Sequence, residues 1–234
     1  MQSSVIVNSE IMGKSRLLTT MTTRNLSAID RLLAEADSML RSLSRRGASA
    51  ARPSPAEGHS DADLTPEEQR HAAGLMRVNH TGEVCAQALY QGQALTARTA
   101  GTRDEMLDAA QEEIDHLVWC EERLQELNAR PSALNPLFYG ASLAMGAAAG
   151  AISDKMSLGF VHATEERVAS HLRHHLKILP RQDRKSQLIL QKMLEDEERH
   201  GANALKAGGE EFPRPIKDVM SALSQLMTRS TYYL

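Results

Sequence analysis

The stretch Glu113-Ile114-Asp115-His116 recurs in its spacing as Glu197-Glu198-Arg199-His200, and each stretch follows a lone glutamate by about thirty residues. Positions i and i+3 of an α-helix share a face about one turn apart, so the glutamate and histidine of each stretch can reach one metal ion. Glu83 precedes the first pair by 30 residues and Glu165 precedes the second by 32. This interval suits a helical hairpin, which brings the lone glutamate level with the pair on the next helix. The spacing predicts four helices that converge on four glutamates and two histidines.

Apolar residues place these glutamates on the inward faces of their helices. Around Glu165 they recur at steps of three and four and leave its place vacant: Leu158, Val161, Val168, Leu172, Leu176 and Leu179. Glu197 completes a similar stripe, formed by Leu190, Leu194, Gly201 and Ala204. A carboxylate on an apolar helix face is costly unless it is paired or bound to a metal. Two divalent cations would cancel the four negative charges, so the pattern favours a metal centre.

The ligand types indicate which metal the centre would take. Structural zinc favours thiolates and four ligands, and calcium uses oxygen alone. A mixture of carboxylates and imidazoles suits iron or manganese. Di-iron and di-manganese bundles are known to use one glutamate from each of two helices and a Glu-x-x-His pair from each of two others. The choice of iron or manganese is therefore a match to a known pattern.

The composition is typical of one soluble globular domain. The chain has 234 residues, of which 41% are hydrophobic and 24% charged, and its formal net charge is −3. Because the charge is nearly balanced and only 3% of the residues are aromatic, no surface for nucleic acid is indicated. Cys85 and Cys120 form no Cys-x-x-Cys pair, and we expect both to be reduced thiols in the core.

The N-terminal part of the chain divides into two predicted segments. Residues 1–25 are rich in Ser and Thr and are expected to be a disordered extension, with Met1 and Met21 both open as the initiator. Residues 26–43 are expected to form an amphipathic helix with an apolar stripe. It could pack on the domain, on a membrane or on a partner, and the sequence leaves these alternatives open.

Residues 44–64 are rich in Ser, Ala, Pro and Gly and are predicted to be a flexible linker. The main domain, 65–234, starts at Thr65-Pro66-Glu67-Glu68, which combines an N-cap residue, a proline at the first helical position and a capping-box glutamate. Asn79-His80-Thr81-Gly82 is expected to loosen the first helix locally. The predicted helices are 66–99, 103–128, 136–153, 156–179, 184–207 and 215–230, with essentially no sheet.

Residues 131–153 contain no charged side chain. A membrane-spanning helix needs about 20 strongly apolar residues, whereas this run is rich in Gly and Ala and only mildly apolar. One interpretation is a helix of small residues packed tightly against the bundle. The other is a helix that lies in a membrane surface and admits a lipophilic ligand. The two interpretations are compatible.

The remaining histidines carry a weaker signal. His171 and His175 have the i, i+4 spacing of a zinc site, but no glutamate suited to catalysis lies between them. For His171 we favour a role in supporting a metal ligand or in relaying a proton. His80 and His162 are expected to be structural.

Four stretches carry a further signal: Leu75-Met76-Arg77-Val78-Asn79-His80-Thr81-Gly82-Glu83, Glu113-Ile114-Asp115-His116-Leu117, Thr164-Glu165-Glu166 and Asp196-Glu197-Glu198-Arg199-His200. Together they resemble the demethoxyubiquinone hydroxylase family of ubiquinone biosynthesis. The resemblance covers about 66–234, and 26–43 also resembles the start of bacterial members. It implies an all-α fold, a ferritin-like four-helix bundle with additional membrane-facing and terminal helices.

The resemblance implies two iron ions per chain, held by the six residues that the spacing selects. Two glutamates would bridge the irons and each iron would take a further glutamate and a histidine: Glu113 and Glu197 as bridges, Glu83 with His116, and Glu165 with His200. Members are peripheral membrane proteins that use O2 to hydroxylate the ring of a polyprenylated methoxy-benzoquinol, converting demethoxyubiquinol to demethylubiquinol. This implies a monooxygenase on the cytoplasmic side of the cell membrane, with other ubiquinone-biosynthesis proteins as candidate partners.

The electron donor is left open. Some members carry a tyrosine, linked to electron delivery from a nicotinamide, just after the histidine that aligns with His171. Here that position is Leu172, and the chain has no Gly-x-Gly-x-x-Gly fingerprint. NADH, the quinol itself and other donors are therefore all compatible with the sequence.

The alternative function is a ferritin-like iron-binding protein or ferroxidase, which would share the fold and the ligands. It predicts a hydrophilic exterior and a cage of many subunits. The uncharged run over 131–153 and the amphipathic stripe over 26–43 favour the hydroxylase.

Overall fold

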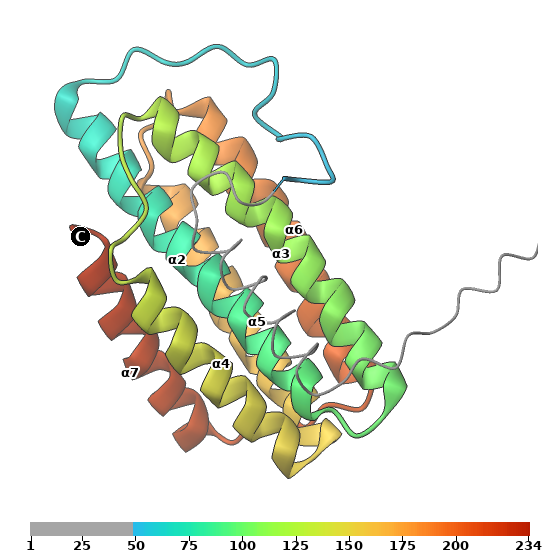
Figure 1. Cartoon of the computed structure of the whole chain (residues 1–234). Coiled ribbons are helices and arrows are strands. Elements are labelled where there is room, and N and C mark those ends of the chain that lie inside the picture. Colours follow the sequence, from blue (N-terminus) through green and yellow to red (C-terminus); the bar gives the residue numbers. More distant parts are fainter. Residues whose placement is uncertain (1–48) are drawn as a thin grey trace, which may run out of the picture.

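The computed structural model describes residues 49–234, in which every regular element is an α-helix (Figure 1). The helices are α2 (Pro66–Thr96), α3 (Ala100–Glu126), α4 (Asn135–Ile152), α5 (Asp154–Ile178), α6 (Arg184–Lys206) and α7 (Arg214–Thr231). This described part has no strand, so the predicted all-α class is confirmed, and each predicted boundary lies within three residues of the observed one. The expectations for 1–25 and 26–43 lie outside the described residues.

The side chains that precede the helices determine where they begin. The Thr65 hydroxyl accepts a hydrogen bond from the Glu68 amide, and the Glu68 carboxylate accepts one from the Thr65 amide, which completes the predicted capping box. Asp183, at the end of the turn between α5 and α6, accepts a hydrogen bond from the Ser186 amide. Each such cap stabilises a helix start by about 1 kcal/mol. The caps thus help to set the lengths of the hairpins α2–α3 and α5–α6.

The two hairpins pack as a four-helix bundle in which α2 contacts α5 and α3 contacts α6. Two apolar clusters fill the bundle: the first includes Met76, Cys120, Leu172 and Met193, and the second includes Tyr90, Met106, Val161 and Ala204. On each of the four helices, the predicted metal ligands lie in sequence between a residue of one cluster and a residue of the other. The ionisable residues therefore form a polar layer inside an apolar core.

Helix α4 packs on the outside of α2 through glycines. A Cβ atom on Gly146 would lie 2.1 Å from the Leu89 carbonyl oxygen, and one on Gly92 would lie 2.2 Å from the Leu143 carbonyl oxygen. Two helix backbones approach this closely only where a side chain is absent. The predicted tight packing of the uncharged run is confirmed for this face of α4.

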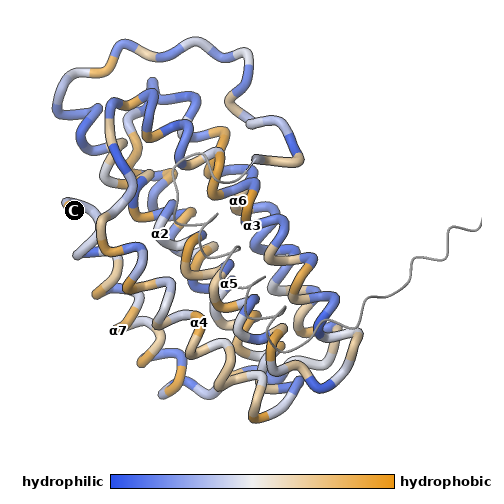
Figure 2. Tube along the Cα trace, viewed as in Figure 1, coloured by the Kyte–Doolittle hydropathy of each residue, from blue (hydrophilic) through white to orange (hydrophobic). Residues whose placement is uncertain are grey.

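The opposite face of α4 and one face of α7 carry exposed apolar side chains. Leu137 and Ile152 on α4 are 67% and 61% exposed, and Val219 and Leu226 on α7 are 61% and 64% exposed. Both helices contact α2 and α5. Figure 2 shows that α4 lacks the long hydrophilic stretches of α3. Among residues 49–234, no helix combines the length and the apolar character needed to cross a bilayer.

The predicted loosening at residues 79–82 is wrong, because α2 is continuous from Pro66 to Thr96. The polar side chains there bond to neighbouring helices, and the Thr81 hydroxyl also bonds to the Arg77 carbonyl oxygen within α2 without interrupting the helix. Asn79 accepts a hydrogen bond from His175 on α5, and Asn135 at the start of α4 donates to His80 and accepts from Thr81.

Residues 49–64, part of the segment predicted to be a flexible linker, form no helix or strand but make specific contacts with α3. The Ala51 amide and the Arg52 guanidinium bond to Asp115, and Asp61 forms an ion pair with Arg123. The first of these contacts lies beside the predicted metal ligand His116.

Candidate metal centre

Four helices bring the six predicted ligands together, and none of the six is more than 7% exposed: Glu83 on α2, Glu113 and His116 on α3, Glu165 on α5, and Glu197 and His200 on α6. Their ligand atoms form two groups, each lying within 4.8 Å of one another: Glu83, Glu113, His116 and Glu197 in one, and Glu113, Glu165, Glu197 and His200 in the other. Glu113 and Glu197 belong to both groups, which is the arrangement that two bridging carboxylates require.

Both imidazoles direct Nδ1 toward the carboxylates. His116 Nδ1 lies 3.2 Å from an oxygen of Glu113 and 3.2 Å from one of Glu197. It also lies 3.5 Å from Glu83. His200 Nδ1 lies 3.4 Å from Glu113 and 3.7 Å from Glu197. Nδ1 is therefore the nitrogen that each histidine would offer to a metal ion in this cluster.

The second nitrogen of each imidazole faces a carboxylate on the opposite helix. His116 Nε2, on α3, lies 3.2 Å from Asp196 Oδ2 on α6. His200 Nε2, on α6, lies 3.1 Å from Glu112 Oε2 on α3. Arg199 bonds to both carboxylates, at 2.8 Å from Asp196 and 2.6 Å from Glu112. Carboxylates in this position fix the tautomer and the orientation of a metal-binding histidine.

Sequence reasoning missed these two carboxylates, although a signal was present. Glu112 and Asp196 are the acidic residues directly before the glutamates of the two Glu-x-x-His pairs. Each serves the histidine of the other helix, a contact that appears only once α3 packs against α6. The buried hydroxyl of Tyr90, on α2, donates a hydrogen bond to Glu165 on α5.

Burial and mutual contact shift the pKa values of the cluster in opposite directions. Burial, with the neighbouring carboxylates, raises the pKa of Glu83 and of Glu165 well above the usual range. Burial opposes protonation of His200, but contacts with Glu113 and Glu197 outweigh it and raise the pKa to about 10. The pKa of His116 is raised in the same way, against burial, by Asp196 and Glu113. In the absence of metal, protons bound to these groups therefore offset part of the negative charge of the carboxylates.

Several buried atoms of the cluster make no hydrogen bond: Glu113 Oε1, Glu165 Oε2, both carboxylate oxygens of Glu197, and His200 Nδ1. A buried polar atom without a partner costs about 1–3 kcal/mol. Metal ions between these atoms would satisfy them and neutralise the carboxylates. The residues present therefore fit a pair of metal ions with carboxylate and imidazole ligands, of which iron and manganese are the best matches.

Metal uptake is expected to release protons and to weaken as the pH falls. With a pKa of about 10, His200 holds a proton at neutral pH, and the raised pKa values of Glu83 and Glu165 favour their protonated forms. A metal ion can bind to these groups only after their protons leave. Anaerobic titration of the metal-free protein with Mn²⁺ in weak buffer, followed with a pH electrode, measures the release. His200→Gln should release fewer protons per ion bound, and uptake without acidification would contradict the assignment.

The other candidate histidines have different surroundings. Among residues 49–234, the groups of side chains able to hold a metal ion include neither His171 nor His175. His175 donates to Asn79, and His162 bonds to the Gly201 carbonyl oxygen. Leu172 is fully buried in the first apolar cluster.

A four-helix bundle with this buried layer of carboxylates and imidazoles is of the class of ferritin-like di-metal carboxylate proteins. The family described as "Ubiquinone biosynthesis protein COQ7" matches residues 70–231, and the chain belongs to this family. The chain is 58% identical over 209 residues to the 3-demethoxyubiquinol 3-hydroxylase of Pseudomonas paraeruginosa and 59% identical over 209 residues to that of Azotobacter vinelandii. It is 57% identical over 211 residues to that of Pseudomonas putida. These alignments cover 89–90% of this chain and 97–98% of the relatives.

Proposed function

We propose that this protein is a di-iron monooxygenase of ubiquinone biosynthesis, which uses O2 to hydroxylate the ring of a polyprenyl methoxy-benzoquinol, converting demethoxyubiquinol to demethylubiquinol. The observation that carries the proposal is the pair of ligand groups that share Glu113 and Glu197. The relatives named 3-demethoxyubiquinol 3-hydroxylase, which align over nearly their full length, support the substrate.

The chain's own residues hold and shield the two irons. Glu113 and Glu197 would be shared by the two irons, and each iron would be held by one further glutamate and one histidine: Glu83 with His116, and Glu165 with His200. Tyr90 orients Glu165 through its hydroxyl, and the apolar clusters on both sides of the layer exclude water. When bound, the irons supply the activation of O2 and the oxidation of the ring, while the protein supplies orientation and a dry pocket.

Complementation tests the reaction and separates it from the iron-binding alternative. The full chain is expressed in a bacterial strain whose own demethoxyubiquinol hydroxylase gene is deleted, and the quinones are extracted and profiled. The demethoxy intermediate should disappear and ubiquinone should return, whereas Glu113→Gln should leave the intermediate in place. Persistence of the intermediate beside an iron-loaded wild-type protein would instead favour iron storage or ferroxidase activity.

We further propose that the protein lies on the cytoplasmic surface of the cell membrane, with α4 and α7 toward the lipid. The exposed apolar residues of both helices support this: Leu137, Met145 and Ile152 on α4, and Ile216, Val219, Leu223 and Leu226 on α7. A helix of this kind lies in the plane of the interface, with its apolar face among the acyl chains. A polyprenylated substrate resides in the same layer.

Replacing Leu223 and Leu226 by aspartate is expected to abolish most of the binding to neutral phosphatidylcholine vesicles. Burial of one leucine is worth about 1.5–3 kcal/mol, so each replacement should weaken partitioning by roughly tenfold or more. Gln225→Asp is the matched control, because Gln225 is an exposed polar residue of the same helix. Vesicle co-sedimentation measures the partitioning, and equal binding of the double variant and the control would contradict the orientation.

A further inference from the structure

Arg52 contacts the carboxylates behind the metal centre although it precedes the family match at residue 70. Its Nε lies 2.5 Å from Asp115 Oδ2 and its Nη1 lies 2.8 Å from Asp196 Oδ2. The Ala51 amide donates to the other oxygen of Asp115, at 2.6 Å. One guanidinium therefore joins a carboxylate of α3 to a carboxylate of α6.

The two acids differ in how much they depend on Arg52. Both carboxylates are almost fully buried. Within residues 49–234, Arg52 is the cation that pairs with Asp115, so without it this buried charge would have no counterion. Asp196 has two further cations, but Lys192 and Arg199 both bond to Oδ1, at 3.0 and 2.8 Å. Arg52 bonds to Oδ2, the oxygen that faces His116.

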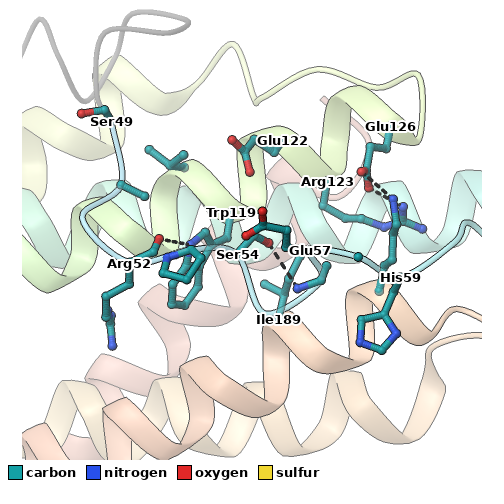
Figure 3. A pocket seen from close by; sticks show the side chains of 16 residues that line it. Ser49, Arg52, Ser54, Glu57, His59, Trp119, Glu122, Arg123, Glu126 and Ile189 are labelled. Atoms are coloured by element: carbon teal, nitrogen blue, oxygen red, sulfur yellow. Dashed lines mark hydrogen bonds and ion pairs between the residues drawn. The ribbon is translucent and has the colours of Figure 1, made fainter.

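Two groups that Arg52 contacts, Asp196 and Trp119, also contact His116. Asp196 Oδ2 accepts from His116 Nε2 at 3.2 Å, which directs His116 Nδ1 toward Glu113 and Glu197. The centroid of the Trp119 ring lies 5.4 Å from that of the His116 ring and 5.0 Å from Cζ of the Arg52 guanidinium. Figure 3 shows the hydrogen bond from Trp119 Nε1 to the Arg52 carbonyl, at the edge of a cavity of about 620 Å³.

We propose that Arg52 is a positioning residue for the metal centre, which acts through Asp196 to hold His116 in its ligand orientation. This inference rests on the proposed metal centre and is independent of the substrate. It assigns a role to the segment before α2: Arg52 supplies a guanidinium to Asp115 and to Asp196 Oδ2, whereas Lys192 and Arg199 bond to Asp196 Oδ1.

Cobalt binding to the full-length protein tests this role. Co²⁺ is titrated into metal-free wild type, R52Q, R52K and D61N, and its visible absorption reports the affinity and ligand set of each bound ion. Binding of each ion is expected as a separate step of the titration. The step that is lost in His116→Ala belongs to the ion that His116 binds. D61N is the control, because it breaks another contact of the same segment, the ion pair with Arg123, which touches no predicted ligand.

R52Q is expected to weaken the His116-dependent step by about tenfold, the lower end of what such supporting residues contribute, because Lys192 and Arg199 still hold Asp196. The other step should be unchanged. R52K should give a smaller loss, since an ammonium keeps the charge but lacks the planar fork that reaches both carboxylates. D61N should leave both steps as in wild type.

The role is overturned if R52Q has wild-type affinity at both steps, weakens both equally, or loses no more than D61N. If R52Q does not fold, R52K decides by the same comparison: a selective loss at the His116-dependent step supports the role, and any other pattern rejects it. A wild-type protein that takes up no Co²⁺ would reject the metal centre itself, whereas failure of the reaction with cobalt binding intact would leave the role of Arg52 standing.

Discussion

Glu197→Ala is expected to remove iron and turnover together. Glu197 belongs to both groups of ligand atoms, and both of its carboxylate oxygens are buried without a hydrogen bond. Because a bridging carboxylate serves both ions, its loss should lower the iron content from about two per chain toward zero. Hydroxylation of the quinol should then fall below detection. Iron analysis of the purified protein and an O2-dependent quinol hydroxylation assay measure the two effects.

Glu198→Ala is the matched control for this change. Glu198 is the next residue along α6, but its half-exposed side chain forms an ion pair with Arg173 on the surface. Its replacement should leave iron and activity unchanged and shift the free energy of unfolding by no more than about 0.5 kcal/mol. Retention of two irons in Glu197→Ala, with circular dichroism showing a folded protein, would remove Glu197 from the ligand set.

Gly146→Ala is expected to give a large loss of stability without touching the metal centre. The added Cβ atom would lie 2.1 Å from the Leu89 carbonyl oxygen, a backbone atom that cannot rotate aside, so α4 would have to move away from α2. Overpacking of this kind typically lowers the free energy of unfolding by about 1–3 kcal/mol. Chemical denaturation of the metal-free protein measures the loss and avoids a contribution from bound metal.

Gly140 provides the control within the same helix, because a Cβ atom there meets nothing within 4 Å. Gly140→Ala should raise the stability by up to about 1 kcal/mol through the helix propensity of alanine. The two alanine variants therefore differ in the sign of the effect. Equal stabilities would contradict the close approach of α4 to α2.

The helices and the grouping of the six candidate ligands could be predicted from the sequence because the patterns that indicate them are local or periodic. The i, i+3 spacing of Glu113 and His116 places both side chains on one face regardless of the rest of the fold. Apolar stripes and the capping box at Thr65 depend on a few neighbouring residues, and they predicted helix boundaries to within three residues.

Contacts between distant residues could not be predicted in this way. The pairing of Asp196 with His116 spans 80 positions and that of Arg52 with Asp196 spans 144. For residues 44–64, composition indicated flexibility but gave no sign of the Arg52 contacts. At residues 79–82, polar side chains suggested a loosened helix because their partners, Asn135 and His175, lie on other helices.

Mössbauer spectroscopy with iron analysis of the iron-loaded, full-length protein tests the central claim most directly. The two ligand groups, which share the carboxylates of Glu113 and Glu197, should hold about two irons per chain. In the oxidised protein the two irons should be antiferromagnetically coupled through these carboxylates. A single iron per chain, or two irons that are magnetically independent, would contradict a shared centre built on Glu113 and Glu197.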